Sequence, residues 1–144
     1  MGEEVFEESL REEPKEVVRV VGSNNSVAKV VLVNSEFAGY ALGHCPLLED
    51  IRELQLEGAY NSHLIYLDTF VVLPGFQGLG LGKLLLREFI SGAKNKGYDI
   101  LEGHFRKEGS GSYHIIKKFG AEDIEVKHNW GDSGEDYVYC RLRL

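Results

Sequence analysis

Residues 71–86 read VVLPGFQGLGLGKLLL, and no other stretch of the chain is as informative. The end of an apolar strand leads into a turn with three alternating glycines, Gly78, Gly80 and Gly82, and then into leucines at helical spacing. Glycines let a ligand approach the backbone closely, and the first amide groups of a helix have no partner within the helix. Because the positive end of the helix dipole lies at the same point, the stretch predicts a phosphate site, and more specifically a pyrophosphate site.

The spacing does not match either of the two common nucleotide loops. A Walker A loop fails because Gln77 stands where its first glycine is required and Leu84 follows Lys83. A dinucleotide-binding fingerprint fails because Lys83 stands where its third glycine is required. The pattern that fits is Gln-x-x-Gly-x-Gly, formed by Gln77, Gly80 and Gly82, and it resembles the acetyl-CoA loop of the GCN5-related N-acetyltransferase (GNAT) superfamily. A glycine-rich turn without a ligand is the alternative.

Length and composition indicate one domain that spans residues 1–144. The chain is 43% hydrophobic and 27% charged, without internal repeats. No apolar run approaches the ~18 residues of a membrane span, and the N-terminus lacks the pattern of a secretory signal. Cys45 and Cys140 are too few for a disulfide framework, so we expect a cytoplasmic protein. The five histidines show no ligand spacing, so we expect no metal.

The net charge of −7 argues against nucleic acid as a partner. It agrees with a cationic substrate and equally with an ordinary acidic surface.

Apolar periodicity predicts alternating strands and helices. Residues 17–21 fit either a strand or a helix end, and a short helical stripe precedes Pro14. In the strand at 64–72, strict alternation places Tyr66, Asp68, Phe70 and Val72 on one face. The remaining expected elements are strands at 29–34, 37–44, 99–105, 124–128 and 137–144, and helices from Pro46 to near Gly58, from Leu81 to a cap at Gly97, and at 112–118.

This order resembles the GNAT superfamily from Lys29 to the end of the chain. The resemblance implies an α/β (α+β) fold with a mixed central sheet, in which the strands at 64–72 and 99–105 form a splayed parallel pair. The N-terminal part is shorter than the family pattern, so its opening strand is absent, rebuilt or supplied by a partner subunit.

The resemblance also implies how acetyl-CoA binds. The pantetheine arm would pair with the backbone of Phe70, Val71 and Val72 like an additional strand. The pyrophosphate would lie on the loop and helix start formed by Gln77, Gly78, Leu79, Gly80, Leu81, Gly82 and Lys83.

The implied activity is transfer of acetyl from acetyl-CoA to a primary amine by direct attack in a ternary complex. The strand at 65–72 resembles most the polyamine and diamine acetyltransferase branch, where the position of Asp68 is a glutamate often assigned as the base. A structural, hydrogen-bonded carboxylate is the alternative for Asp68. The general acid of many members would fall at Ile116, so Tyr113 is the substitute candidate, with core packing as its alternative. His104 and Ser112 are further candidates.

The acceptor is not readable from the sequence. Small polyamine-like or aminoglycoside-like amines and protein amino groups all fit a primary amine. Glu49, Glu53 and Glu57 recur every four residues, which fits a surface for a cationic acceptor or a solvated helix face. An exposed edge strand or the aromatic final strand is a candidate homodimer surface. A non-catalytic acyl-CoA-binding sensor or interaction module of the same fold is the alternative function.

Overall fold

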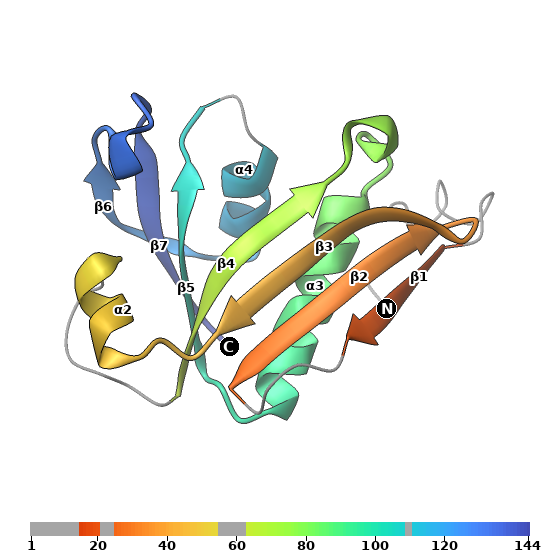
Figure 1. Cartoon of the computed structure of the whole chain (residues 1–144), viewed down its shortest axis with the longest axis horizontal. Helices are drawn as coiled ribbons and strands as arrows, with labels where there is room; N and C mark the ends of the chain where they lie inside the picture. Colours follow the sequence, from red (N-terminus) through yellow and green to blue (C-terminus); the bar gives the residue numbers. More distant parts are fainter. Residues whose placement is uncertain (1–14, 21–24, 55–62, 109–110) are drawn as a thin grey trace.

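The computed structural model describes residues 15–20, 25–54, 63–108 and 111–144 (Figure 1). Its elements are β1 (Lys15–Val20), β2 (Ser26–Val33), β3 (Glu36–His44), α2 (Leu48–Glu53), β4 (Leu64–Val72), η1 (Pro74–Phe76), α3 (Leu81–Asn95), β5 (Ile100–Arg106), α4 (Gly111–Lys118), β6 (Glu122–Lys127), η2 (Trp130–Asp132) and β7 (Tyr137–Arg143). The helical stripe expected before Pro14 lies outside the described residues. The helix expected from Pro46 to near Gly58 is shorter than predicted, because α2 ends at Glu53 with its C-cap at Leu54.

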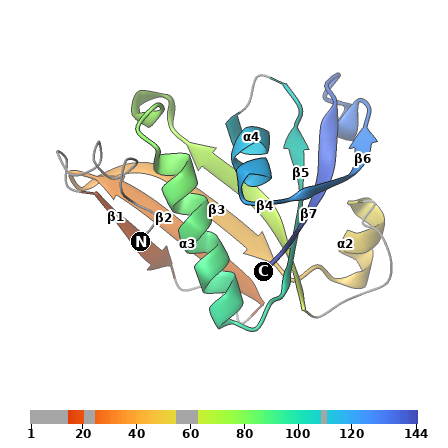
Figure 2. The ribbon, with the colours of Figure 1, turned by 180° about the vertical axis from the view of Figure 1, so that it is seen from behind.

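A seven-stranded sheet in the order β1-β2-β3-β4-β5-β7-β6 organises the molecule. The pairing is antiparallel except between β4 and β5, which run parallel. Helices α3 and α4 lie on one face of the sheet and α2 lies on the other (Figures 1 and 2). This arrangement confirms the expected mixed sheet.

Segment Lys15–Val20, which the sequence pattern left between strand and helix end, forms β1 and pairs antiparallel with β2. The described chain therefore carries its own opening strand. The next connection, between β2 and β3, is a tight hairpin in which Asn34 and Ser35 both have positive φ angles. Such a two-residue turn matches the twist of the flanking strands.

Helix α3 supplies the centre of the core. Its apolar stripe packs against the sheet, with Leu85, Leu86 and Phe89 at 0% exposure. The sheet presents Ile65 and Leu67 of β4 to the same core. Removing this much apolar surface from water stabilises the fold and fixes where α3 begins relative to β4.

The strict alternation expected along β4 is wrong because the strand contains a β-bulge. Leu42 of β3 pairs with Thr69 and its neighbour Gly43 pairs with Leu67, so Asp68 is an extra residue on β4. A bulge reverses the alternation of the residues that follow it. Phe70 and Val72 consequently pack against the core with Leu67, and not on the face of Asp68.

Strands β4 and β5 separate soon after they meet. Their parallel register contains only the pairs Leu64–Ile100, Ile65–Leu101 and Tyr66–Glu102. Beyond these pairs the two strands diverge, and α4 lies behind the space between them (Figures 1 and 2). The splay expected between the two parallel strands is therefore present, and it opens towards the glycine loop.

Candidate active site

A cavity of about 550 Å³ lies where β4 and β5 diverge. Its walls come from the end of β4, the loop that follows it, the first turn of α3, the end of β5 and one side of α4. The lining residues are Phe70, Val71, Val72, Phe76, Gln77, Gly78, Gly80, Leu81, Gly82, Lys83, Arg106, Gly111, Ser112, Ile115 and Lys118. The structure thus brings together all of the residues predicted to contact the cosubstrate except Leu79, which packs against the core.

The N-terminus of α3 faces this cavity without a capping side chain. Gly80 occupies the N-cap position with a φ of 75°, and the first turn contains no acidic residue. The first backbone bond of the helix is donated by the Leu84 amide to the Gly80 carbonyl, 3.2 Å away. The first turn of a helix has amides without an acceptor inside the helix, and an anion is the external acceptor that the helix dipole favours.

The glycines of the loop serve different purposes. Gly78 and Gly80 have φ angles of 83° and 75°, which other residues adopt at a cost. At Gly82 a side chain would begin 2.8 Å from Cδ1 of Ile115, so this glycine allows α4 to approach α3. Gln77 holds the loop on β4 because its side-chain amide donates to the Val72 carbonyl over 3.1 Å.

Two cations that the sequence analysis did not select also line the cavity. Arg106 ends β5 and Lys118 ends α4, and both meet Lys83 of the glycine loop around the same space. Nη1 of Arg106 also lies 3.3 Å from Oε2 of Glu135, which makes an ion pair. These two residues carry no motif, and only the topology of the fold brings them to the loop.

The edge of β4 that faces the cavity has alternating backbone groups. A side chain on Gly39 would collide with the Val71 carbonyl oxygen, so Val71 directs its backbone groups at β3. Successive residues of a strand direct their backbone groups to opposite sides. Phe70 and Val72 therefore direct theirs at the splay, where the β4–β5 register has already ended.

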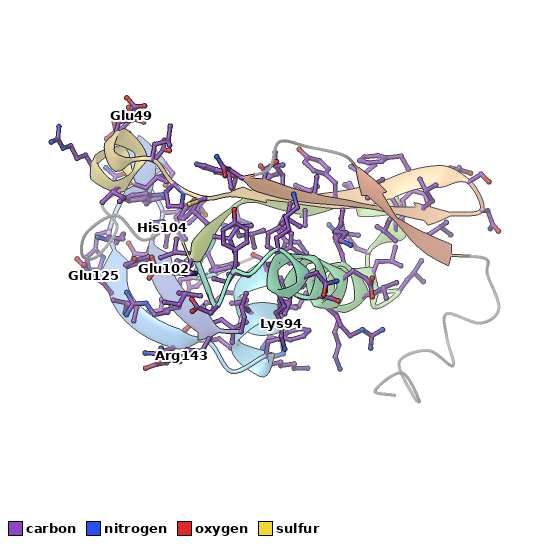
Figure 3. The ribbon with its side chains drawn as sticks, turned by 90° about the horizontal axis from the view of Figure 1, so that it is seen from below. Glu49, Lys94, Glu102, His104, Glu125 and Arg143 are labelled. Atoms are coloured by element: carbon purple, nitrogen blue, oxygen red, sulfur yellow. The ribbon has the colours of Figure 1, made fainter. Side chains whose placement is uncertain are left out.

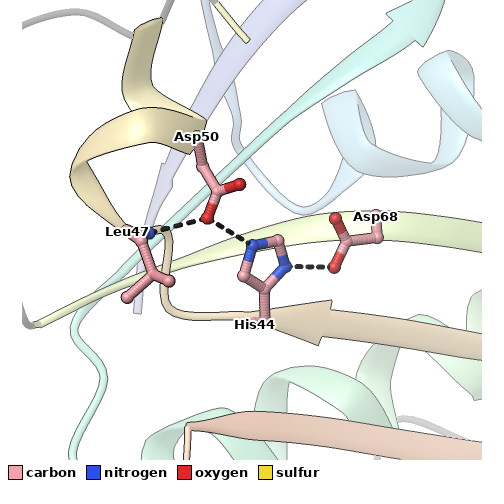
Figure 4. Close-up of polar contacts among 4 residues, drawn as sticks. All are labelled: His44, Leu47, Asp50 and Asp68. Atoms are coloured by element: carbon pink, nitrogen blue, oxygen red, sulfur yellow. Dashed lines mark hydrogen bonds and ion pairs between the residues drawn. The ribbon is translucent and has the colours of Figure 1, made fainter. Parts of the chain in front are cut away.

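Asp68 lies beside this edge, in contact with a histidine from the neighbouring strand. Its Oδ2 is 2.5 Å from Nδ1 of His44, the last residue of β3 (Figure 4). The other ring nitrogen, Nε2, lies 3.3 Å from Oδ2 of Asp50 in α2. The same Asp50 oxygen accepts the backbone amide of Leu47 over 2.8 Å, at the start of α2. The imidazole thus bridges two carboxylates from two different elements.

The electrostatics of the bridge raise the pKa of both His44 and Asp68. Burial lowers the pKa of His44, but hydrogen bonds and charge from Asp68 and Asp50 outweigh burial and leave that pKa raised. Burial raises the pKa of Asp68, and the opposing effect of His44 is smaller. In an isolated ion pair His44 would depress the pKa of Asp68, so the raised value marks partial burial beside a second carboxylate.

Tyr113 does not reach the cavity. Its hydroxyl donates to Oδ2 of Asp123 on β6 over 2.7 Å. This bond, followed by burial, raises the pKa of Tyr113 to about 12. Ser112, the neighbouring residue in α4, does line the cavity.

The remaining candidate, His104, belongs to an aromatic cluster on β5, β7 and η2. Its ring stacks on Trp130 with centroids 3.9 Å apart and on Tyr139 at 5.0 Å. The hydroxyl of Tyr66 lies 2.7 Å from His104 Nδ1. The neighbouring Glu102 is fully buried and accepts hydrogen bonds from Tyr139 and Arg141. These contacts bury Tyr139, which is 1% exposed.

The acidic stripe of α2 is divided by the structure. Glu49 and Glu53 are exposed, and Glu49 lies on the outer side of the helix (Figure 3). Glu57 lies outside the described residues. In the described ranges no helix is long and apolar enough to cross a bilayer, and no group of His, Cys, Asp and Glu is arranged to hold a metal ion.

A sequence model of the acetyltransferase (GNAT) family matches residues 3–121. The chain belongs to the GNAT family. An uncharacterized N-acetyltransferase of Methanocaldococcus jannaschii is 29% identical over 98 residues, and the [ribosomal protein bS18]-alanine N-acetyltransferase of Haemophilus influenzae is 33% identical over 62 residues. These matches cover 68% and 43% of this chain but only 40% and 42% of the relatives. This GNAT chain therefore spans about two-fifths of the curated relatives that it matches.

Solved GNAT structures share the fold at low identity. The ribosomal-protein-S18-alanine N-acetyltransferase of Escherichia coli superposes with a TM-score of 0.71 at 14% identity, over 90% of this chain and 94% of that one. A putative streptothricin acetyltransferase of Bacillus anthracis, solved with acetyl coenzyme A, has a TM-score of 0.66 at 14% identity and covers 86% of this chain and 65% of that one.

Proposed function

We propose that this GNAT chain is an N-acetyltransferase that moves acetyl from acetyl-CoA to a primary amine by direct attack in a ternary complex. The observation that carries the proposal is the cavity at the splay, where an open strand edge and an uncapped helix N-terminus face the same space. A pantetheine arm needs the first feature and a pyrophosphate needs the second. The acetyl coenzyme A present in the B. anthracis relative supports this assignment.

The backbone groups of Phe70 and Val72 would pair with the pantetheine amides. The pyrophosphate would accept hydrogen bonds from the amides of residues 78–83, with Lys83 adding positive charge. Arg106 and Lys118 extend this charge around the cavity, in a chain whose net charge is −7. The cations concentrate where the phosphates of the cosubstrate would lie.

Asp68 would take a proton from the ammonium form of the acceptor. The amine nitrogen then forms a bond to the thioester carbonyl carbon, and the carbon–sulfur bond breaks with its electron pair on sulfur. Tyr113 would not serve as the acid, because its hydroxyl donates a hydrogen bond to Asp123. A thiol with a pKa near ~8.5, like that of free cysteine, leaves as a thiolate without much assistance.

Two acceptor classes remain within the proposal. The H. influenzae relative is named for the alanine of a ribosomal protein, which favours a protein amino group. The strand around Asp68 resembles the polyamine and diamine branch, which favours a small cationic amine. Comparing a peptide that begins with alanine against a polyamine separates the two classes directly.

The test is release of CoA thiol from acetyl-CoA at pH 8 with polyamines, aminoglycosides, amino acids and peptides as acceptors. We expect release that depends on the amine and that yields an acetylated product by mass spectrometry. No release from folded protein that binds acetyl-CoA, with any acceptor, would contradict the activity and favour an acyl-CoA-binding module.

A charge reversal in the cavity tests the cosubstrate site. We expect Lys118→Glu to raise the Kd for acetyl-CoA at least ~10-fold, because an attraction to phosphate becomes a repulsion. Lys94→Glu is the matched control, since Lys94 is exposed near the far end of α3. Calorimetry of both variants at 50 mM salt measures the difference. Equal affinities in the two variants would place the phosphates elsewhere.

A further inference from the structure

We propose that Asp68 and His44 act as one coupled base, with Asp50 holding the imidazole in position. Asp68 would be the catalytic residue that meets the amine, and His44 and Asp50 would be positioning residues. The inference deepens the proposed acetyl transfer and rests on it.

The geometry couples the two side chains. His44 Nδ1 and Asp68 Oδ2 are 2.5 Å apart, within hydrogen-bond distance, so the protonation of one side chain changes that of the other. His44 Nε2 faces Asp50, which is itself fixed by the Leu47 amide at the start of α2. The imidazole therefore cannot rotate away from Asp68 without breaking its bond to α2 (Figure 4).

The bulge in β4 is what makes this contact. Asp68 is the extra residue between the partners of Leu42 and Gly43, immediately before His44 on β3. Bulges frequently direct one side chain away from the regular alternation beside active sites. Here the bulge leaves Asp68 opposite the end of β3 and returns Phe70 to the cavity side.

The cluster is accessible, as a base must be. The side chains of His44, Asp68 and Asp50 are 32%, 30% and 27% exposed. Tyr66 of β4, a further titratable group of the described chain, also faces the imidazole, with ring centroids 6.5 Å apart. Its hydroxyl is directed at His104 Nδ1, away from the bridge.

Chemistry explains why a coupled base is needed. An isolated aspartate titrates near ~3.9 and an alkylammonium near ~10.4, a mismatch of more than six pH units. When His44 is neutral with its proton on Nε2, its Nδ1 lone pair faces the Asp68 carboxylate. The lone pair and the carboxylate repel each other, and one more proton between them removes this repulsion. The pair therefore takes up a proton more readily than a lone carboxylate does.

The proton balance is simple. The ammonium gives one proton to the Asp68 carboxylate, where it is shared with His44 Nδ1. The freed electron pair forms the carbon–nitrogen bond, and the pair of the broken carbon–sulfur bond leaves with sulfur. The second proton of the attacking nitrogen goes to solvent, and the thiolate takes up a proton from solvent.

The first test is the pH dependence of kcat/KM. We expect a rising limb in the parent protein that shifts to lower pH in His44→Asn, with a plateau at least ~10-fold lower. Asparagine keeps a donor near the position of Nδ1 but does not titrate. Asp50→Asn should shift the limb in the same direction, because removing a carboxylate lowers the pKa of the pair.

Glu49→Gln is the matched control, since it removes the same charge from the adjacent, exposed position of α2. We expect its limb to stay in place. A plateau that falls in His44→Asn without a shift of the limb would make the histidine merely structural and overturn the inference.

An NMR titration of the His44 ring separates this inference from the proposed activity. If no amine supports CoA release, the acetyl transfer itself has failed, and the titration still reports on the pair. A His44 midpoint that falls in Asp68→Asn and Asp50→Asn, but not in Glu49→Gln, supports the coupling. A midpoint unchanged in all three variants overturns it.

Discussion

His104 is a half-buried base whose pKa lies well below that of an ordinary histidine. Among the described residues its Nε2 has no hydrogen-bond partner, while its ring is sandwiched between Trp130 and Tyr139. Burial, and then the charge of Lys127, lowers the pKa of His104 to about 4. An unfolded chain would bind a proton at this residue near ~6.5. The difference makes His104 a source of acid sensitivity.

The free energy of unfolding should therefore decrease as the pH falls from ~6.5 to about 4, because only the unfolded state takes up the proton. In His104→Phe, which keeps an aromatic ring but cannot titrate, the decrease should be smaller even if the variant is less stable at pH 7. Urea unfolding at pH 7 and pH 4.5 measures both. The same decrease in parent and variant would contradict the assignment.

Single residues also show how far the sequence can be interpreted. The glycine loop was predictable because its chemistry depends on backbone groups and local spacing. The bridge between Asp68 and His44 was not, because these residues are 24 positions apart and meet only through strand pairing. Arg106 and Lys118 were missed for the same reason, since neither belongs to a motif.

Two glycines of β3, Gly39 and Gly43, allow β3, β4 and α3 to lie close together. A side chain on Gly43 would begin 2.6 Å from the Phe89 ring of α3 and 2.7 Å from the Tyr66 carbonyl oxygen. The bulge that presents Asp68 begins at the same position. Gly43 thus couples the packing of the core to the placement of the proposed base.

Gly43→Ala should destabilise the protein by about 1–3 kcal/mol, because the added methyl overpacks against backbone and an immobile ring. Gly75→Ala is the control, since a methyl there meets nothing within 4 Å. Urea unfolding curves of the two variants provide the comparison. If Gly43→Ala were as stable as Gly75→Ala, β3 and α3 would have to be more adaptable than the packing indicates.

Some element boundaries followed the apolar pattern, but β2 begins at Ser26, before the expected 29, and α2 ends at Glu53, before the expected Gly58. The helix after the glycine loop and the strand at 64–72 were predicted within a residue or two of α3 and β4. The bulge was not predicted, because it results from register with β3 and leaves no mark in the composition of β4. Burial of Tyr139 required the stacking on His104, which is equally non-local.

At the scale of the whole molecule, the sheet of the described residues has two parts. One part contains β1 to β4 and the other contains β5, β7 and β6, and the two meet along a short parallel register. Beyond Tyr66 and Glu102 the cavity takes the place of strand pairing. A pantetheine arm on β4 would add backbone hydrogen bonds to an edge that β5 no longer pairs with beyond Tyr66. Binding should therefore stabilise this edge more than the rest of the sheet.

Saturating acetyl-CoA should slow hydrogen exchange of the Phe70 and Val72 amides, which face the splay. Val71 between them is the internal control, because its backbone groups face β3. Exchange measured by NMR with and without acetyl-CoA tests the alternation residue by residue. Equal changes at all three amides would indicate general stabilisation without strand-like pairing.

The short parallel register between β4 and β5 is the junction at which the two parts of the sheet are hydrogen-bonded to each other. Three residue pairs form this junction, and α3 and the hydrophobic core pack behind them. A cosubstrate bound at the splay would extend the strand pairing along β4, and its dissociation would remove that extension. The separation between the two parts of the sheet would then depend on the same edge of β4 that would hold the acetyl donor.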